Sequence, residues 1–196
     1  MDKMDTASTG SGVNMSRRRA GLGLLALGAS AACSNGVGSN GAAVIDARVD
    51  STVNFMFNRY PGTQDLAAKS TGMLVMPVIT EVGLGIGGGF GRGALRVNNI
   101  TVDYYSAASA SAGFQIGAQQ YAHVFFFMTQ PALLDFRRSS GWSAGADVEY
   151  AFRDEGQALK AGTVTALSPV VAVIFGQAGL RLGATLEGTK YTRIIP

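Results

Sequence analysis

The chain is short of the residues on which most catalytic and metal sites depend. Its 196 residues include one cysteine and one histidine. One cysteine cannot form an internal disulfide, and it excludes a zinc site built on Cys-x-x-Cys pairs. One histidine, His123, leaves no His-rich metal cluster and argues against a Ser-His-Asp triad. We therefore expect no metal and no cofactor, a structural role for His123, and a protein that is not an enzyme.

Charged residues are also scarce, and long hydrophobic runs are missing. Charged residues make up 15% of the chain and hydrophobic residues 47%, with a net charge of +3. Four of the sixteen Lys and Arg residues precede Cys33, so the remainder is nearly neutral. A nucleic-acid-binding protein needs a concentrated basic face, so we expect no nucleic-acid partner. No apolar stretch reaches the ~18 residues of a membrane-spanning helix, yet the hydrophobic share is ample for a folded core.

The N-terminal region has the layout of an export signal. Arg17–Arg19 precede 13 residues that are mostly apolar, residues 20–32, which end in small side chains. A basic segment, a short apolar segment and small residues at its end are typical of a secretory signal peptide. We expect residues 1–32 to be an N-terminal extension and signal peptide, with Met15 as an alternative start.

The single cysteine stands directly after this segment. Ala31 and Ala32 precede Cys33, an arrangement that resembles the lipobox of bacterial lipoproteins, although Ser30 replaces the usual leucine. We expect acylation of Cys33, with residues 33–41 as a flexible tether rich in Gly, Ser and Asn. This predicts an outer-membrane lipoprotein of the cell envelope, facing the periplasm or the surface and attached to the membrane through its acyl anchor. The alternative is cleavage by the ordinary signal peptidase, which would release a soluble periplasmic protein.

Residues 42–60 carry a helical pattern. Apolar side chains recur there at intervals of three or four: Ile45, Val49, Val53, Met56 and Tyr60. This stripe predicts an amphipathic helix that ends at Pro61-Gly62, and Thr63 is expected to cap a second short helix through Ala68. We expect the stripe to pack against a sheet; the alternative is a helix on a membrane surface, although its polar face has few Lys or Arg residues.

Glycine recurs at every second position after a strand predicted over Met73–Ile79: Gly83, Gly85, Gly87, Gly89, Gly91 and Gly93. Side chains alternate across a strand, so one face of this segment is bare. A dinucleotide-binding loop would have to turn into a helix here, but the alternation continues to Arg96 and indicates a strand. A bare face allows a helix to lie close, the sheet to curl sharply, or a ligand to approach the backbone.

The rest of the chain reads as short strands and turns. Further strands are predicted over residues 102–118, 122–128, 142–152, 170–176 and 180–188. Asn98-Asn99 is a predicted turn, and Thr129 is expected to cap a short helix over Pro131–Arg138. We expect an α+β domain over residues 42–196 that is mainly β. It would contain a Gly-rich, strongly curved, barrel-like antiparallel sheet, the N-terminal amphipathic helix and one or two short helices.

Ten short blocks carry a resemblance to a known family: Pro61–Leu66, Gly72–Pro77, Gly83–Gly88, Gly91–Leu95, Tyr104–Ser106, Ser109–Gln119, Phe127–Thr129, Ser139–Trp142, Val173–Leu180 and Leu186–Lys190. Their order and spacing resemble the SYLF lipid-binding domain family over residues 42–194. The resemblance implies a lipid-binding module. Eukaryotic members bind phosphoinositides and some bind actin, whereas bacterial members are commonly exported lipoproteins. We carry over lipid binding alone, with phospholipid or another anionic lipid as the expected partner.

Basic side chains are the candidates for contacts with lipid phosphates. The candidate lipid-binding residues are Arg92, Arg96, Arg137, Arg138, Lys190 and Arg193, with Trp142 as a candidate membrane-inserting aromatic. The alternatives are solvated surface charges for the basic residues and a core position for the tryptophan. The alternative function is a non-catalytic envelope component that docks an unknown protein partner.

Overall fold

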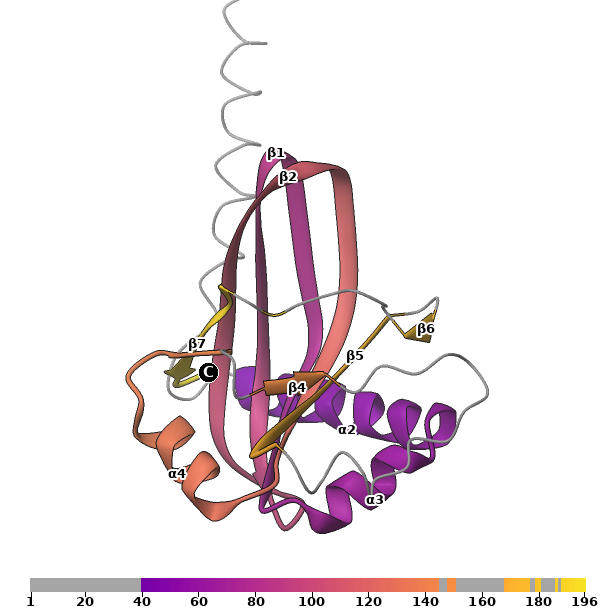
Figure 1. Ribbon diagram of the computed structural model, residues 1–196, viewed down its shortest axis with the longest axis vertical. Helices are drawn as coiled ribbons and strands as arrows, with labels where there is room; N and C mark the ends of the chain where they lie inside the picture. Colours follow the sequence, from indigo (N-terminus) through magenta and orange to yellow (C-terminus); the bar gives the residue numbers. More distant parts are fainter. Residues whose placement is uncertain (1–39, 145–147, 151–167, 177–178, 181–185, 187) are drawn as a thin grey trace, which may run out of the picture. The chain divides into compact units, whose positions relative to one another are not determined.

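The computed structural model describes residues 40–144, 148–150, 168–176, 179–180, 186 and 188–196 (Figure 1). The helices are α2 (Gly41–Arg59), α3 (Gly62–Lys69) and α4 (Gln130–Arg138). The strands are β1 (Gly72–Val97), β2 (Ile100–Phe127), β3 (Trp142–Ser143), β4 (Val148–Tyr150), β5 (Val170–Gly176), β6 (Gly179–Leu180) and β7 (Lys190–Ile194). None of these helices is long and apolar enough to cross a membrane. The predicted signal peptide, Cys33 and parts of two predicted strands lie outside the described residues.

A single long hairpin forms the centre of the sheet. β1 has 26 residues and β2 has 28, and they pair antiparallel from Gly72 opposite Phe127 to Val97 opposite Ile100. The predicted turn at Asn98-Asn99 is confirmed. Both residues have positive φ values, 52° and 64°, which is the conformation of a two-residue hairpin turn whose twist matches that of the strands. The predicted extension of the Gly-rich segment as a strand is confirmed as well.

β5 and β7 pair with β2, and the sheet continues in the order β3-β7-β2-β5-β4, while β1 also pairs with β2 and β6 with β5. β7 pairs with the first half of β2, at residues 104–108, and β5 with the second half, at residues 122–127. The curled, half-barrel sheet confirms the predicted fold class. Two details were not predicted: β7 was missed as a strand, and β4 runs parallel to β5.

The bare glycine face is used by the hairpin itself. A Cβ atom added at Gly93 would collide with the carbonyl oxygen of Val75, and one added at Gly91 with that of Val78. The second half of β1 therefore lies against the first half of the same strand. Figure 1 shows the hairpin rising away from the helices, bending over at its far end and returning. Of the uses expected for this face, sharp curling is found, whereas the close neighbour is the backbone of β1 itself, which was not among the expected uses.

Each face of the sheet is covered by helices. α4 packs Leu133 and Phe136 on one face, in a cluster that includes Phe125 and Phe127 of β2. α2 and α3 cover the other face with apolar side chains that contact alternate residues of β1, β2 and β5. The members of this second cluster include Ile45, Val49, Met56, Leu66, Met73, Val75, Val124, Phe126, Val171 and Val173. The predicted packing of the first helix against the sheet is thus confirmed.

The helix ends follow local chemistry. Thr129 caps α4 as predicted, because its hydroxyl oxygen accepts a hydrogen bond from the backbone N–H of Ala132 at 3.4 Å. The predicted capping role of Thr63 is wrong. Thr63 lies inside α3, where its hydroxyl donates to the carbonyl oxygen of Tyr60 at 2.7 Å. Thr63 is fully buried, so this bond ties the end of α2 to the start of α3.

Candidate functional site

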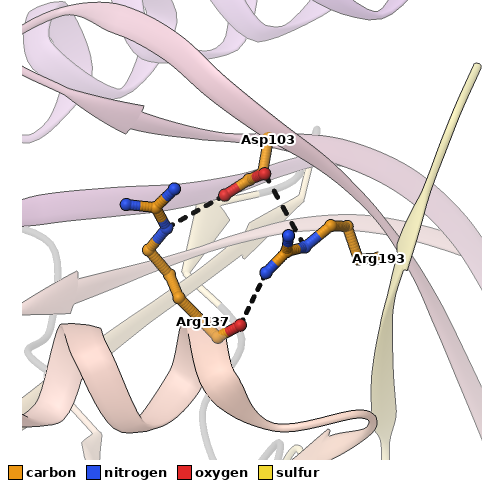
Figure 2. A network of polar contacts seen from close by, with 3 residues as sticks. All are labelled: Asp103, Arg137 and Arg193. Atoms are coloured by element: carbon orange, nitrogen blue, oxygen red, sulfur yellow. Dashed lines mark hydrogen bonds and ion pairs between the residues drawn. The ribbon is translucent and has the colours of Figure 1, made fainter.

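Three charged side chains from three elements meet where α4 lies beside β2 and β7 (Figure 2). The Arg137 side chain of α4 donates from Nε to Asp103 Oδ2 of β2 at 3.0 Å. Nε of Arg193, on β7, lies 3.6 Å from Asp103 Oδ1. Nη2 of Arg193 also donates to the backbone carbonyl oxygen of Arg137 at 2.6 Å. We call Arg137 and Arg193, together with the Asp103 carboxylate that they share, the arginine pair.

The end of α4 and the pairing of β7 with β2 explain why these residues gather. Arg137 lies in the last turn of α4, where backbone carbonyl groups have no partner within the helix and the helix dipole favours positive charge. Arg193 supplies one of the missing donors. It reaches the helix because β7 pairs with β2 in a register that sets Arg193 opposite Tyr105, two residues from Asp103. Sequence reasoning selected both arginines but missed Asp103, whose only signal was its position in a strand poor in charge.

The arginine pair has an excess of positive charge. The Asp103 side chain is only 12% exposed, whereas the side chains of Arg137 and Arg193 are 38% and 51% exposed. In Figure 2 the two terminal nitrogens of Arg137 point away from Asp103. Guanidinium groups bind phosphate and carboxylate groups through two parallel hydrogen bonds. This geometry can therefore present N–H donors to an added anion while one buried carboxylate holds both side chains in place.

The neighbouring candidates differ in exposure. Arg138 and Lys190 are exposed, and the aliphatic part of the Lys190 side chain lies against Gly141. Trp142 packs among aromatic rings and makes edge contacts with Phe125 and Phe136 at centroid distances of 5.3 and 5.4 Å. Its contacts favour the core position that was the alternative for this residue.

Arg92 and Arg96 are not part of the arginine pair. Nη1 of Arg96 lies 2.6 Å from Asp50 Oδ1 of α2, and the Arg96 side chain is only 13% exposed. Because α2 and α4 cover opposite faces of the sheet, Arg96 and the arginine pair lie on different faces. The Arg92 guanidinium lies over the ring of Phe90, 5.8 Å from its centroid.

A polar contact that sequence reasoning missed ties α2 to β2. Asp46 accepts hydrogen bonds from Thr101 Oγ1 at 2.8 Å and from the Tyr104 hydroxyl at 2.7 Å. Burial raises the pKa of Tyr104 to about 12, and the hydrogen bond to Asp46 adds to this shift. Tyr104 therefore remains a neutral donor at neutral pH. The contact anchors α2 to β2.

The only histidine is buried in β2. His123 is 0% exposed, and its Nε2 lies 2.9 Å from the hydroxyl oxygen of Tyr191. Burial lowers the pKa of His123 to about 3, so the ring is neutral at neutral pH. Its Nδ1 has no hydrogen-bond partner among the described residues. These observations agree with the structural role expected for His123. Among the described residues, no group of three His, Cys, Asp or Glu side chains could hold a metal ion.

Comparison with known families identifies the class of this domain. Residues 108–193 match the family model Ysc84, described as "Las17-binding protein actin regulator". The match confirms the resemblance to the SYLF (Ysc84) family over residues 108–193, and this family is broadly associated with lipid binding. The match includes α4 and most of β7, and hence both arginines of the arginine pair, but it begins after Arg92 and Arg96. No curated protein matches the chain.

Proposed function

We propose that this protein is an exported envelope lipoprotein, acylated on Cys33, whose SYLF domain binds the phosphate groups of anionic lipids. The observation that carries the binding function is the arginine pair, in which Arg137 and Arg193 share the single carboxylate of Asp103. The family match supports lipid as the partner. The order of Arg17–Arg19, an apolar segment and Cys33 supports export and acylation.

Asp103 prepares the two arginines for binding. A flexible arginine loses side-chain entropy when it binds an anion, about 0.5–1.5 kcal/mol for each side chain that becomes ordered. In the arginine pair, part of this cost is already met in the free protein because Asp103 and the Arg137 carbonyl hold both guanidinium groups. The exposed Arg138 adds positive charge beside them. A lipid phosphate can therefore gain two guanidinium contacts at low conformational cost.

Vesicle flotation tests this proposal with the full chain carrying Cys33→Ser, so that no acyl anchor contributes. Binding to phosphatidylcholine vesicles is compared with binding to phosphatidylglycerol vesicles, at low and high salt. We expect preference for the anionic vesicles and weaker binding at high salt, because ions screen exposed charges.

Charge-matched variants separate the arginine pair from general attraction. Arg137→Gln with Arg193→Gln should weaken anionic-vesicle binding about tenfold or more, since each basic residue near an anionic surface contributes about 1 kcal/mol. Arg48→Gln with Lys69→Gln removes the same charge from exposed positions of α2 and α3 and should change binding much less. Equal losses of vesicle binding in the two double variants would show that net charge, and not the arginine pair, accounts for the binding. Absence of vesicle binding would remove the lipid function and favour the alternative, an envelope component that docks a protein.

Acylation has its own test. Growth of an expressing bacterium with labelled palmitate should label the wild-type protein in the outer-membrane fraction and leave the Cys33→Ser variant unlabelled. A labelled Cys33→Ser variant, or an unlabelled wild-type protein in the soluble periplasm, would contradict the lipoprotein assignment.

A further inference from the structure

A second feature lies away from the arginine pair, between α2 and the base of the β1–β2 hairpin. It is a groove with a volume of about 320 Å³. Phe55 of α2 and Val78 of β1 form its walls, and Phe175 of β5 lies beside them. We call it the α2 groove. Ligand sites in proteins have volumes of about 300–1,000 Å³, so the α2 groove is at the small end of this range.

An irregularity in β1 forms one wall. Met76 pairs with His123 and Ile79 with Tyr121, so the register shifts between them and Pro77 and Val78 stand outside the regular ladder. Proline has no N–H to donate to a neighbouring strand, which favours such a break. Met76 and Ile79 are 0% and 2% exposed, whereas Val78 is 38% exposed. The shift therefore turns an apolar side chain outward into the groove.

The opposite wall is aromatic. The ring of Phe55 stacks on that of Phe175, with centroids 5.9 Å apart and planes 25° apart. Phe175 is buried beneath it, but Phe55 remains 45% exposed although it is a large apolar residue. An exposed apolar surface of this kind, facing a hollow, commonly marks a binding site.

The chemistry of the lining residues limits the class of ligand that the groove can bind. Among the described residues that line the groove none is charged, and the polar ones include Ser51, Thr52 and Gln120. A charged ligand group buried here would lose its hydration without gaining an ionic partner, which is unfavourable. A hydrocarbon chain would gain from burial against Phe55 and Val78. The small volume has room for part of one hydrocarbon chain but not for a whole two-chain lipid.

We propose that the α2 groove binds a single acyl chain of a membrane lipid, with the polar head of that lipid left outside. This inference rests on the proposed lipid-binding function and adds a second, uncharged element to it. The arginine pair would recognise phosphate, and the α2 groove would recognise hydrocarbon. Because the two sites use different residues, one can fail without the other.

Displacement of cis-parinaric acid, a fluorescent fatty acid, by palmitic acid from the Cys33→Ser chain tests the α2 groove. Palmitic acid and its methyl ester should compete about equally, because none of the described lining residues carries a charge that could bind a carboxylate. Ser51→Trp places a large ring in the groove from an exposed position of α2, and it should weaken binding at least tenfold. Asn54→Trp adds the same ring to an exposed α2 position outside the groove and should leave binding unchanged.

Phe55→Gln is a second variant that removes the aromatic wall, and it should also weaken fatty-acid binding. Circular dichroism of each variant shows whether it is folded. Fatty-acid binding that persists in folded Ser51→Trp and Phe55→Gln, or that is absent from the wild-type chain, would overturn the groove assignment. If either of these results is obtained but salt-sensitive binding to anionic vesicles is still observed, the groove assignment fails and the proposed function stands. Loss of vesicle binding only in the Arg137 and Arg193 double variant, with fatty-acid binding intact, would show that the two sites are separate.

Discussion

The two halves of the β1–β2 hairpin are stabilised in opposite ways. Near the helices, the base half (residues 72–79 and 120–127) carries large side chains on both faces, and Phe125, Phe126 and Phe127 are 0% exposed. The glycine half (residues 87–93 and 106–110) carries glycine, alanine and serine at most positions. The base half buries apolar side chains, whereas the glycine half brings backbone against backbone.

The difference reverses the effect of side-chain size. Each glycine in a strand costs roughly 0.5–1 kcal/mol relative to alanine, because glycine has more freedom to lose on folding. The glycine half accepts this cost because Gly91 and Gly93 contact the carbonyl oxygens of Val78 and Val75, and an added Cβ would separate the layers. In the base half, removal of atoms should destabilise the fold. In the glycine half, addition of atoms should do so.

The largest effect is expected in the base half. Phe125→Ala would leave a cavity beside Trp142 and Tyr191, whose rings both lie 5.3 Å from that of Phe125. It should lower the free energy of unfolding by about 3–5 kcal/mol in urea titrations. Phe90→Ala is the matched change in the glycine half, where Phe90 is 52% exposed, and it should cost less than about 1 kcal/mol. Equal losses in the free energy of unfolding at Phe125 and Phe90 would contradict the proposed difference between the base half and the glycine half.

Gly93→Ala tests the glycine half directly. The added methyl group would collide with the Val75 carbonyl, and we expect a loss of about 3 kcal/mol in the free energy of unfolding. The control is Gly176→Ala, because a Cβ there would lie 3.6 Å from the Gln120 carbonyl oxygen, an ordinary contact. A Gly93→Ala variant as stable as Gly176→Ala would show that the two halves of β1 do not approach as described.

The base half should also respond to acid through His123. The pKa of His123 is 6.5 in the unfolded reference and about 3 in the folded protein. Between these values the unfolded chain binds a proton that the folded chain does not, so the free energy of unfolding falls as the pH drops below 6.5. His123→Gln removes this titration and can still contact the Tyr191 hydroxyl. Comparison of urea midpoints from pH 7 downward should show an extra wild-type loss of about 2 kcal/mol by pH 5. An equal loss of stability in the wild-type protein and in His123→Gln would contradict this account of His123.

The smallest effect is expected at α4, one of the helices that cover the base half. Thr129→Ala removes the side-chain acceptor at the start of α4 and should cost about 1 kcal/mol in thermal or urea unfolding. Ser140→Ala, an exposed change just after α4, serves as the control and should be neutral within about 0.5 kcal/mol. If Thr129→Ala is also neutral, the cap contributes nothing to holding α4 on the base half.

Much of the fold could be predicted because its causes are local. The alternation of glycines indicated a strand, Asn98-Asn99 indicated a turn, and the apolar stripe indicated α2. β7 could not be found in this way, because it has only five residues and is a strand only through its pairing with β2. The capping role expected of Thr63 failed because tertiary packing buried its hydroxyl against the end of α2.

The residue types of the candidate site could be predicted, but the contacts between its residues could not. Arg137 and Arg193 were selected as basic residues able to meet phosphate, as were Arg92 and Arg96. That the first two share Asp103, while Arg96 pairs with Asp50 on the other face, follows only from sheet pairing and helix placement. Asp103 and Arg137 are 34 residues apart in the sequence. No short-range pattern encodes a contact over that distance.

The sequence by itself determined which segments are extended, which are helical and where side chains are absent, because these properties depend on neighbours a few residues away. It also carried the order of short blocks that marks the SYLF family. Only the tertiary structure decided what fills the bare face of β1, which arginines converge, and that a register shift at Pro77 opens the α2 groove. Those features depend on contacts between distant segments, whose formation requires the whole sheet to curl and pack.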